Sequence, residues 1–349
     1  MPKRKTDAGA TIWDVAKASN VSIATVSHVI NNGPRTVRPD TRDRVLEAIK
    51  KLNYHPNAMA RGLVRRRMNT VGVLSGVFAA QDVVANQYAS GILQGILNGS
   101  SSAGYDVMLF TEGWVNLETS GTVYRDRRAD GIITIAPPLG SDMVSGLVSL
   151  ELAVTAVSAD CLLLGVPGVD VDNIVGSRLA VDHLLSLGHR RIAHIQGNAD
   201  LVSAQIRSAG FMTAMTNAGL DVPAEYLGRA YYSGLHAYEQ TTALLRLPEP
   251  PTAIFAANDE IAIGAISAAR DLGLSVPNDL SVVGFDDTPS VMHLSPPLTT
   301  LRQPLAAIGE LATNLLIERV TKGSVAAEMH LIEPELMVRA STAPPRTSS

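Results

Sequence analysis

The sequence has almost no cysteine and no long apolar run. The single thiol, Cys161, excludes an intrachain disulfide and a cysteine-rich metal site, so we expect a small buried or incidental side chain there. No stretch approaches the ~18 uninterrupted apolar residues of a membrane span. The basic N-terminus is not followed by the apolar segment of an export signal. We therefore expect a soluble, cytoplasmic protein.

A strong net charge is also missing from the chain as a whole, because 29 Lys and Arg residues nearly balance 33 Asp and Glu residues. The balance hides two unlike parts. Residues 1–67 carry 14 basic and five acidic side chains, a net of +9, whereas the remainder carries −13. This asymmetry predicts a polyanion-binding module joined to a larger domain with a different task.

Common catalytic motifs are absent as well: the chain contains no G-x-S-x-G, no Walker A sequence and no HExxH. Structural roles inside a helix or strand are expected for three neighbouring histidines, His183, His189 and His194. Three carboxylates could suggest a metal site: Asp259, Asp286 and Asp287. The simpler interpretation is that they belong to a cleft that binds a neutral ligand. We therefore expect no catalytic residue, no metal and no cofactor.

Three short helices are predicted near the N-terminus, over residues 12–19, 23–31 and 41–52. Thr11 and Asp14 have the spacing of a capping box, and Asp40 is expected to cap the third helix. Helical spacing predicts an inward face made of Ile12, Val15, Ala16, Val26, Ile30, Val45, Ile49 and Leu52. Asn20-Val21-Ser22 forms a turn between the first two helices, which gives a helix-turn-helix.

From residue 69 onward, short β-branched runs alternate with helical stretches, which is typical of parallel α/β sheets. The expected strands are 70–74, 105–110, 131–135, 153–157, 192–196, 252–256 and 280–284. The expected helices are 87–103, 142–150, 174–187, 202–218, 235–245, 260–272 and 304–321. The predicted fold class is an all-α headpiece followed by two doubly wound parallel-sheet lobes, which bind a ligand in the cleft at their strand ends.

Both parts resemble the lactose/galactose-repressor family of bacterial transcription factors. The resemblance rests on TIWDVAK (11–17), TVSHVIN (25–31), NYHPNAMARGL (53–63), AND (257–259), VGFDD (283–287) and LTTLRQP (298–304). It covers Thr11 to Ala340 and implies a periplasmic-binding-protein-like core in which the chain crosses between lobes near residues 165, 296 and 326.

The resulting domain division has five parts. It assigns 1–56 to the headpiece, 57–68 to a hinge helix and linker, 69–165 with 297–326 to an N-terminal lobe, 166–296 with 327–340 to a C-terminal lobe, and 341–349 to a polar tail.

DNA contacts are expected from the headpiece and the hinge. The resemblance implies that Ile23, Ala24 and His28 read bases, the lesser alternative for His28 being a solvated helix residue. It also implies that Leu63 wedges into the minor groove from a hinge helix over 58–64, the alternative being packing against the next domain. The other expected contact residues are Thr11, Ser22, Thr25, Ser27, Asn31, Tyr54, Asn57 and Ala60.

Effector contacts are expected at strand ends of the core. The resemblance assigns them to Arg207, Asn258 and Asp286, a set that suits a sugar or polyol. Aromatic walls are expected from Tyr88 and Phe285, with core packing as an equal alternative for Phe285. Where many relatives carry a ligand-binding Asp, this chain has Ser158, followed by Asp160, which removes or shifts one carboxylate.

The sequence thus predicts a homodimeric, ligand-responsive repressor that binds a pseudo-palindromic operator. A nucleoside or purine is the alternative effector. Two other protein classes remain open. A solute-binding protein for sugar uptake would have a similar core, but the missing export signal and the basic headpiece disfavour it. A sugar-processing enzyme with a DNA-binding appendage would need catalytic residues, and no catalytic motif is found.

Overall fold

The computed structural model describes residues 10–31, 37–55, 67–76 and 80–346, with the backbone alone for residue 31 and residues 80–82. The chain divides into two compact units, Met1–Met68 and Asn69–Ser349, which we call the headpiece and the core.

The headpiece consists of α1 (Ile12–Ser19), α2 (Ile23–Asn31) and α3 (Pro39–Lys51) around a small apolar centre. Thr11 caps α1 in a capping box with Asp14, as predicted. The third helix begins earlier than expected, because Pro39 occupies its first position and Asp40 lies inside the first turn instead of capping it. The buried apolar residues of the described headpiece are Val15, Ala16, Val26, Val29, Val45 and Ala48. Val29 therefore takes the central place predicted for Ile30, which packs at the edge.

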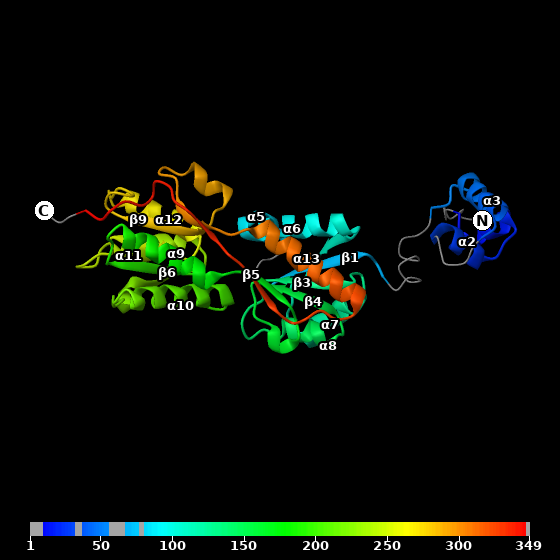
Figure 1. Cartoon of the computed structure of the whole chain (residues 1–349), viewed down its shortest axis with the longest axis horizontal. Coiled ribbons are helices and arrows are strands. Elements are labelled where there is room, and N and C mark those ends of the chain that lie inside the picture. The colour runs from blue at the N-terminus through cyan, green and yellow to red at the C-terminus, as the bar shows by residue number, and fades with distance from the viewer. Residues whose placement is uncertain (1–9, 32–36, 56–66, 77–79, 347–349) are drawn as a thin grey trace, which may run out of the picture. The chain divides into compact units, whose positions relative to one another are not determined.

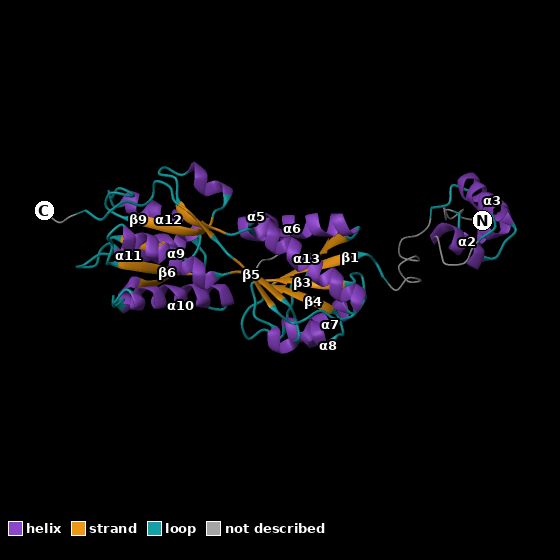
Figure 2. Ribbon diagram, viewed as in Figure 1, coloured by secondary structure: helices purple, strands orange, loops and turns teal. Residues whose placement is uncertain are grey.

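The core contains two six-stranded sheets flanked by helices, which define a first and a second lobe (Figures 1 and 2). The first sheet has the order β11-β5-β4-β3-β1-β2 and the second β12-β10-β9-β8-β6-β7. All paired strands are parallel except β12, which runs antiparallel to β10. Parallel strands bring their carboxyl ends to one edge, and polar side chains at those ends can converge there.

The first lobe contains β1 (Thr70–Ser75), β2 (Asp106–Leu109), β3 (Gly131–Ile135), β4 (Ala153–Val157), β5 (Gly168–Val171) and β11 (Met329–Ile332), with α5 (Ala80–Ala85), α6 (Gln87–Ala103), α7 (Leu117–Tyr124), α8 (Met143–Ser149) and α13 (Leu305–Lys322). The second lobe contains β6 (Ile192–Gln196), β7 (Leu227–Arg229), β8 (Ala253–Ala256), β9 (Ser281–Asp286), β10 (Thr299–Arg302) and β12 (Glu335–Met337), with α9 (Asn173–Ser186), α10 (Val202–Asn217), α11 (Gly234–Leu244) and α12 (Asp259–Asp271).

The chain crosses between the lobes at later positions than the sequence indicates. Strands β5 and β11 belong to the first sheet and β10 to the second, so the crossings follow Val171, Arg302 and Ile332. The expected positions near 165, 296 and 326 are therefore too early, because these strands have only four residues each and lack a long β-branched run.

Small residues allow the two long helices of the first lobe to pack closely. A Cβ added to Gly95 of α6 would lie 1.9 Å from the Ala306 carbonyl oxygen of α13, and one on Gly309 would meet the Ile92 backbone at 2.1 Å. Larger residues would therefore force α6 and α13 apart.

Across the described ranges, none of the helices has the length and apolar composition that a membrane crossing requires.

Candidate functional site

Helix α2 presents the residues predicted to contact DNA. Ser22 accepts a hydrogen bond from the Thr25 backbone N–H at 3.1 Å, and the two hydroxyl groups lie 2.9 Å apart, so Ser22 caps α2. Ala24 is exposed, whereas Thr25, Ser27 and His28 are half-buried. Short, accessible side chains at the start of this helix leave its N-terminus open to an anion.

The remaining predicted DNA contacts are placed less favourably or fall outside the described residues. Ile23 and Tyr54 pack against the apolar centre of the headpiece. The Thr11 hydroxyl donates to Asp14 at 2.7 Å, so it is already engaged in the capping box. For Asn31 only the helical backbone is described. Three residues lie outside the described ranges: Asn57, Ala60 and Leu63.

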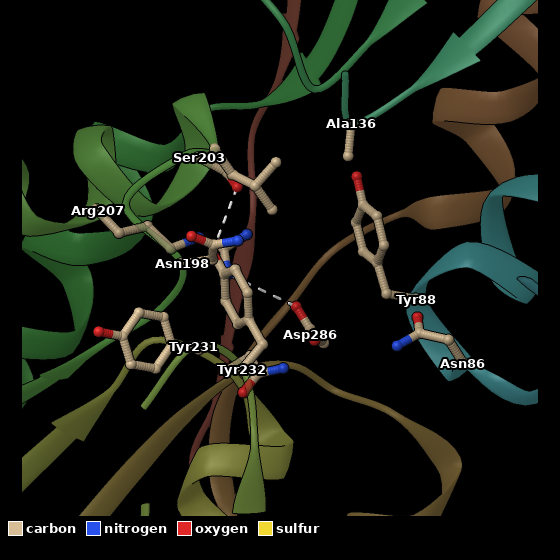
Figure 3. A pocket seen from close by; sticks show the side chains of 11 residues that line it. Asn86, Tyr88, Ala136, Asn198, Ser203, Arg207, Tyr231, Tyr232 and Asp286 are labelled. Carbon is tan, nitrogen blue, oxygen red and sulfur yellow. Dashed lines mark hydrogen bonds and ion pairs between the residues drawn. The ribbon is translucent and has the colours of Figure 1, made fainter. Parts of the chain in front are cut away.

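A cavity of about 240 Å³ opens at the strand ends of the core (Figure 3). Side chains from both lobes line it: Asn86, Tyr88 and Ala136 from the first, and Asn198, Leu201, Ser203, Arg207, Tyr231, Tyr232, Asn258 and Asp286 from the second. The predicted residues Tyr88, Arg207, Asn258 and Asp286 therefore meet at one cavity.

Arg207 is the central cation of this cavity and is only 3% exposed. Its Nε donates to Asn173 Oδ1 at 2.8 Å and its Nη1 to the Ala257 carbonyl at 2.6 Å. The same Nη1 lies 3.8 Å from the Asp286 carboxylate. The guanidinium also lies over the Phe285 ring, with its carbon 3.7 Å from the ring centroid. These contacts fix the guanidinium beside the cavity.

Two buried carboxylates belong to the surroundings of Arg207: Asp286, which pairs with it, and Asp259, which neighbours Asp286. Burial raises the pKa of Asp286 to about 6, although Arg207 and a 2.5 Å hydrogen bond from Gln303 favour its ionised form. Burial and the neighbouring Asp286 raise the pKa of Asp259 to about 8. Asp259 accepts hydrogen bonds from the Thr288 backbone and hydroxyl and from the Thr300 hydroxyl. Only Asp286 of this pair lines the cavity.

Ser158 does not line the cavity but lies behind Tyr88. Its Oγ is 2.5 Å from the Tyr88 hydroxyl and donates to Asp170 Oδ1 at 2.9 Å. Asp160, the expected replacement for the missing carboxylate, is exposed and lies outside the lining. The nearest buried acid to Ser158 is therefore Asp170, which the sequence did not indicate.

Phe285 is also absent from the cavity wall, because it is fully buried in the core and supports Arg207 from beneath. Successive strand residues point to opposite faces, so Asp286 and Phe285 cannot both face the ligand. Of the two expectations for Phe285, core packing agrees with its position.

Backbone strain is concentrated at the strand ends around the cavity. Four of the lining residues other than glycine have positive φ: Ala136, Tyr231, Tyr232 and Asp286, the last at 125°. Such conformations cost about 1–3 kcal/mol each. Their clustering at one cavity is typical of a functional site.

Several lining residues were missed by the sequence analysis. Asn198 follows β6 and Ala136 follows β3, so the strand-end rule could have found them. Tyr231 and Tyr232 follow β7, whose three residues are too few for a strand pattern.

The three histidines have structural partners. His194 bonds to the Phe255 carbonyl at 2.9 Å, and burial lowers its pKa to about 4. His189 is buried among Thr252, Ser281 and the Ala343 carbonyl, while His183 contacts Thr342. No cluster of metal-binding side chains occurs within the part of the chain that the structure describes.

Comparison with known proteins agrees with this architecture. Residues 11–57 match the model for bacterial regulatory proteins of the lacI family, and residues 181–342 match the periplasmic binding protein-like domain. The HTH-type transcriptional repressor PurR of Mannheimia succiniciproducens is 34% identical over 339 residues, which cover 95% of this chain and 98% of that protein.

Two solved structures are similar over almost the whole chain. The Lac repressor dimer bound to operator and the anti-inducer ONPF has a TM-score of 0.82 at 29% identity, covering 96% of this chain and 99% of that one. The complex of the transcriptional regulator CelR with cellobiose has a TM-score of 0.72 at 31% identity, covering 95% and 99%. The chain thus belongs to the lacI family of bacterial regulatory proteins and is a ligand-responsive, DNA-binding transcriptional regulator, not an enzyme.

Proposed function

We propose that the chain is a cytoplasmic, homodimeric repressor whose affinity for an operator depends on a sugar or polyol bound between the lobes of its core. The observation that carries the proposal is the convergence of Arg207, Asn258 and Asp286 with side chains of the first lobe at one cavity.

The chemistry of the cavity favours a small polyhydroxylated ligand. Asp286 accepts hydrogen bonds from hydroxyl groups, while Asn198 and Asn258 can donate through their amide nitrogens. The oxygens of the two amides already accept from the Asp200 and Ile261 backbone N–H groups. The rings of Tyr88 and Tyr232 offer flat surfaces to the apolar faces of a sugar. The volume lies below the ~300–1,000 Å³ of pockets for drug-sized ligands, so a small metabolite fits best.

A purine or nucleoside is the second candidate ligand. It is favoured by the adjacent tyrosines Tyr231 and Tyr232, because aromatic rings stack on a planar base. The Asp286 carboxylate would then accept from ring or amino N–H groups.

The headpiece supplies operator recognition in this proposal. Ala24 and His28 of α2 read base edges in the major groove, and the surrounding hydroxyl groups contact phosphates. Ile23 packs against the apolar centre of the headpiece and adds an apolar contact through the part of its side chain that stays accessible. Leu63 enters the minor groove from the hinge segment that also contains Asn57 and Ala60.

Ligand binding is coupled to DNA binding through the lobes. A ligand that contacts both lobes stabilises the arrangement in which they are closest, and it shifts the protein toward that state. In a dimer, this change alters how the first lobes pack together and hence the separation of the two hinge segments.

The test is a thermal-shift screen of the full-length chain against sugars, polyols, nucleosides and amino acids. A sugar or polyol that stabilises the wild type, and that changes operator affinity in a titration, supports the proposal. Stabilisation by nucleosides alone favours the second candidate, and stabilisation by amino acids alone refutes both.

The DNA half is tested by Leu63→Ala. The substitution is expected to weaken binding to the specific operator at least tenfold more than binding to non-specific DNA, because the wedge acts only at a specific kinked step. Salt titrations of both complexes separate this loss from a general loss of phosphate contacts. Equal losses on both DNAs contradict a wedge role.

A further inference from the structure

A continuous chain of hydrogen bonds runs behind the cavity from the first lobe to the second. Tyr88 Oη contacts Ser158 Oγ at 2.5 Å, and Ser158 Oγ donates to Asp170 Oδ1 at 2.9 Å. Asn173 then joins Asp170 to Arg207. Ser158 and Asp170 are 4% and 2% exposed, so neither contacts a ligand directly.

The donor and acceptor of each hydrogen bond can be assigned in turn, beginning with Arg207, because a guanidinium can only donate. Its Nε donates to Asn173 Oδ1 at 2.8 Å, so the amide nitrogen of Asn173 must face Asp170, where it donates to Oδ2 at 3.0 Å. The Val171 backbone N–H donates to Asp170 Oδ1 at 2.8 Å. Asp170 is therefore surrounded by donors, the environment of an ionised carboxylate. Burial raises its pKa to about 6, which leaves it ionised at pH 8.

The same assignment of donors and acceptors extends from Asp170 through Ser158 to Tyr88 at the cavity. A serine hydroxyl has one hydrogen, and Ser158 uses it for the Asp170 carboxylate. Ser158 can then only accept from Tyr88, whose single hydroxyl hydrogen turns away from the cavity. The phenolic oxygen of Tyr88 keeps a free lone pair and no hydrogen for a ligand. Figure 3 shows Tyr88 and Ala136 among the side chains that the first lobe contributes to the cavity.

We propose that Ser158 and Asp170 are positioning residues that determine ligand specificity by making Tyr88 a hydrogen-bond acceptor. The cavity then selects a neutral or cationic ligand with a hydroxyl or amino group against Tyr88, and it rejects a phosphate or carboxylate there. This inference rests on the proposed function, because it concerns the ligand of the same cavity.

The charges around the cavity act in the same direction. Asp286 also accepts hydrogen bonds at the second-lobe side, and Arg207 uses two of its five N–H groups on Asn173 and the Ala257 carbonyl. An anionic ligand would add negative charge beside the buried carboxylates Asp170 and Asp286, and Arg207 is the one cationic side chain among the residues that line the cavity.

Neutron diffraction of the full-length protein, exchanged into D₂O at pH 8 without ligand, tests the direction directly. We expect the Tyr88 deuterium between Tyr88 and Ser158, and the Ser158 deuterium between Ser158 and Asp170. A Tyr88 deuterium directed into the cavity overturns the inference. This experiment needs no effector, so its result is independent of the proposed ligand class.

Specificity is tested by calorimetry with D-glucose, D-galactose and cellobiose, their monodeoxyfluoro analogues, and the monophosphates of the two monosaccharides. Fluorine only accepts, so at one ring position its introduction should weaken binding to the wild type at least tenfold. In Ser158→Ala the Tyr88 hydroxyl is free to turn and donate, so this penalty should fall to about twofold. The monophosphates should bind the wild type at least tenfold more weakly than the free sugars.

Matched controls separate specificity from damage to the fold. Ser267→Ala removes a hydroxyl that bonds to the Ile263 carbonyl within α12, and it should keep the full fluorine penalty. A purely structural role for Ser158 would lower the affinity for sugar and analogue by the same factor, which overturns the inference. If none of these sugars binds the wild type, the sugar assignment fails, and the deuterium positions alone decide the direction of the hydrogen bonds.

Discussion

The two lobes have closely related sheets but unlike roles at the cavity. In each, five parallel strands follow the same order, β5-β4-β3-β1-β2 in the first and β10-β9-β8-β6-β7 in the second. Yet the first lobe gives three lining residues and the second gives eight, including Arg207, Asn258 and Asp286. The shared sheet order supplies strand ends on both sides, while the side chains at those ends make the contributions of the two lobes to the cavity unequal.

The largest expected effect follows from removing the cation of the second lobe. Arg207→Met leaves Asp286 and Asn173 without their buried partner, and breaking a buried ion pair costs about 3–5 kcal/mol of unfolding free energy. Denaturant titration of the full-length chain measures the loss. Arg178→Met is the control, because its pair with Asp182 is exposed and should contribute less than about 1 kcal/mol. Similar losses in both variants would contradict a special role for the second-lobe arginine.

The next largest effect concerns ligand affinity. Asp286→Asn removes the charged acceptor, and hydrogen bonds to charged groups contribute about 1.5–3 kcal/mol, which corresponds to about a 10- to 150-fold weaker affinity for the best ligand of the screen. Operator binding without ligand should stay within twofold of the wild type. The exposed Asp221→Asn serves as control and should bind ligand normally. An unchanged ligand affinity in Asp286→Asn would contradict a direct contact between the ligand and this carboxylate of the second lobe.

Acid should weaken ligand binding. Hydroxyl donors favour the ionised form of Asp286, whose pKa is raised to about 6, so protonation between pH 7 and pH 5 should lower affinity by about tenfold. Calorimetry at a series of pH values measures this change, together with proton release on binding near pH 6. Asp286→Asn should reduce the pH dependence, and the part that remains would come from Asp170, whose pKa burial also raises to about 6. An affinity that rises on acidification would reverse the assigned role of the carboxylate.

The smallest effect tests what the lobes have in common. Ile133 of β3 and Ile254 of β8 are fully buried in strands of equivalent order. Each Ile→Val substitution should cost about 0.5–1.5 kcal/mol of stability by leaving a small cavity. Neither should change ligand affinity more than twofold. A strong affinity loss in only one of them would show that the sheet interiors differ as well.

Much of the fold could be predicted from the sequence where patterns were long. Helix α6 has the predicted bounds, and α1 begins at its predicted capping box. The strands β5, β7, β10, β11 and β12 were missed because three or four residues carry too little periodicity. Without β5, β10 and β11, nothing in the strand pattern could correct the crossing positions that the resemblance implied.

The candidate site was only partly predictable. Arg207, Asn258 and Asp286 could be predicted because the family resemblance assigned each of them individually. All three line the cavity. Ser158 was noticed as a departure, but its partner Asp170 lies twelve residues further along and meets it only through the pairing of β4 with β5. Contacts between neighbouring strands depend on register, which a single sequence does not specify.

The late crossings also govern how the core can form during synthesis. Strand β10, helix α13, strand β11 and strand β12 come from the last fifty or so residues of the described chain, yet they complete both sheets. A ribosome that has produced the whole region through β9 has therefore finished neither lobe. Until those final segments emerge, the first sheet lacks the helix α13 that covers it, and β9 is an unpaired edge of the second sheet. The nascent core therefore exposes apolar surface and a strand edge that favour aggregation until the chain is nearly complete.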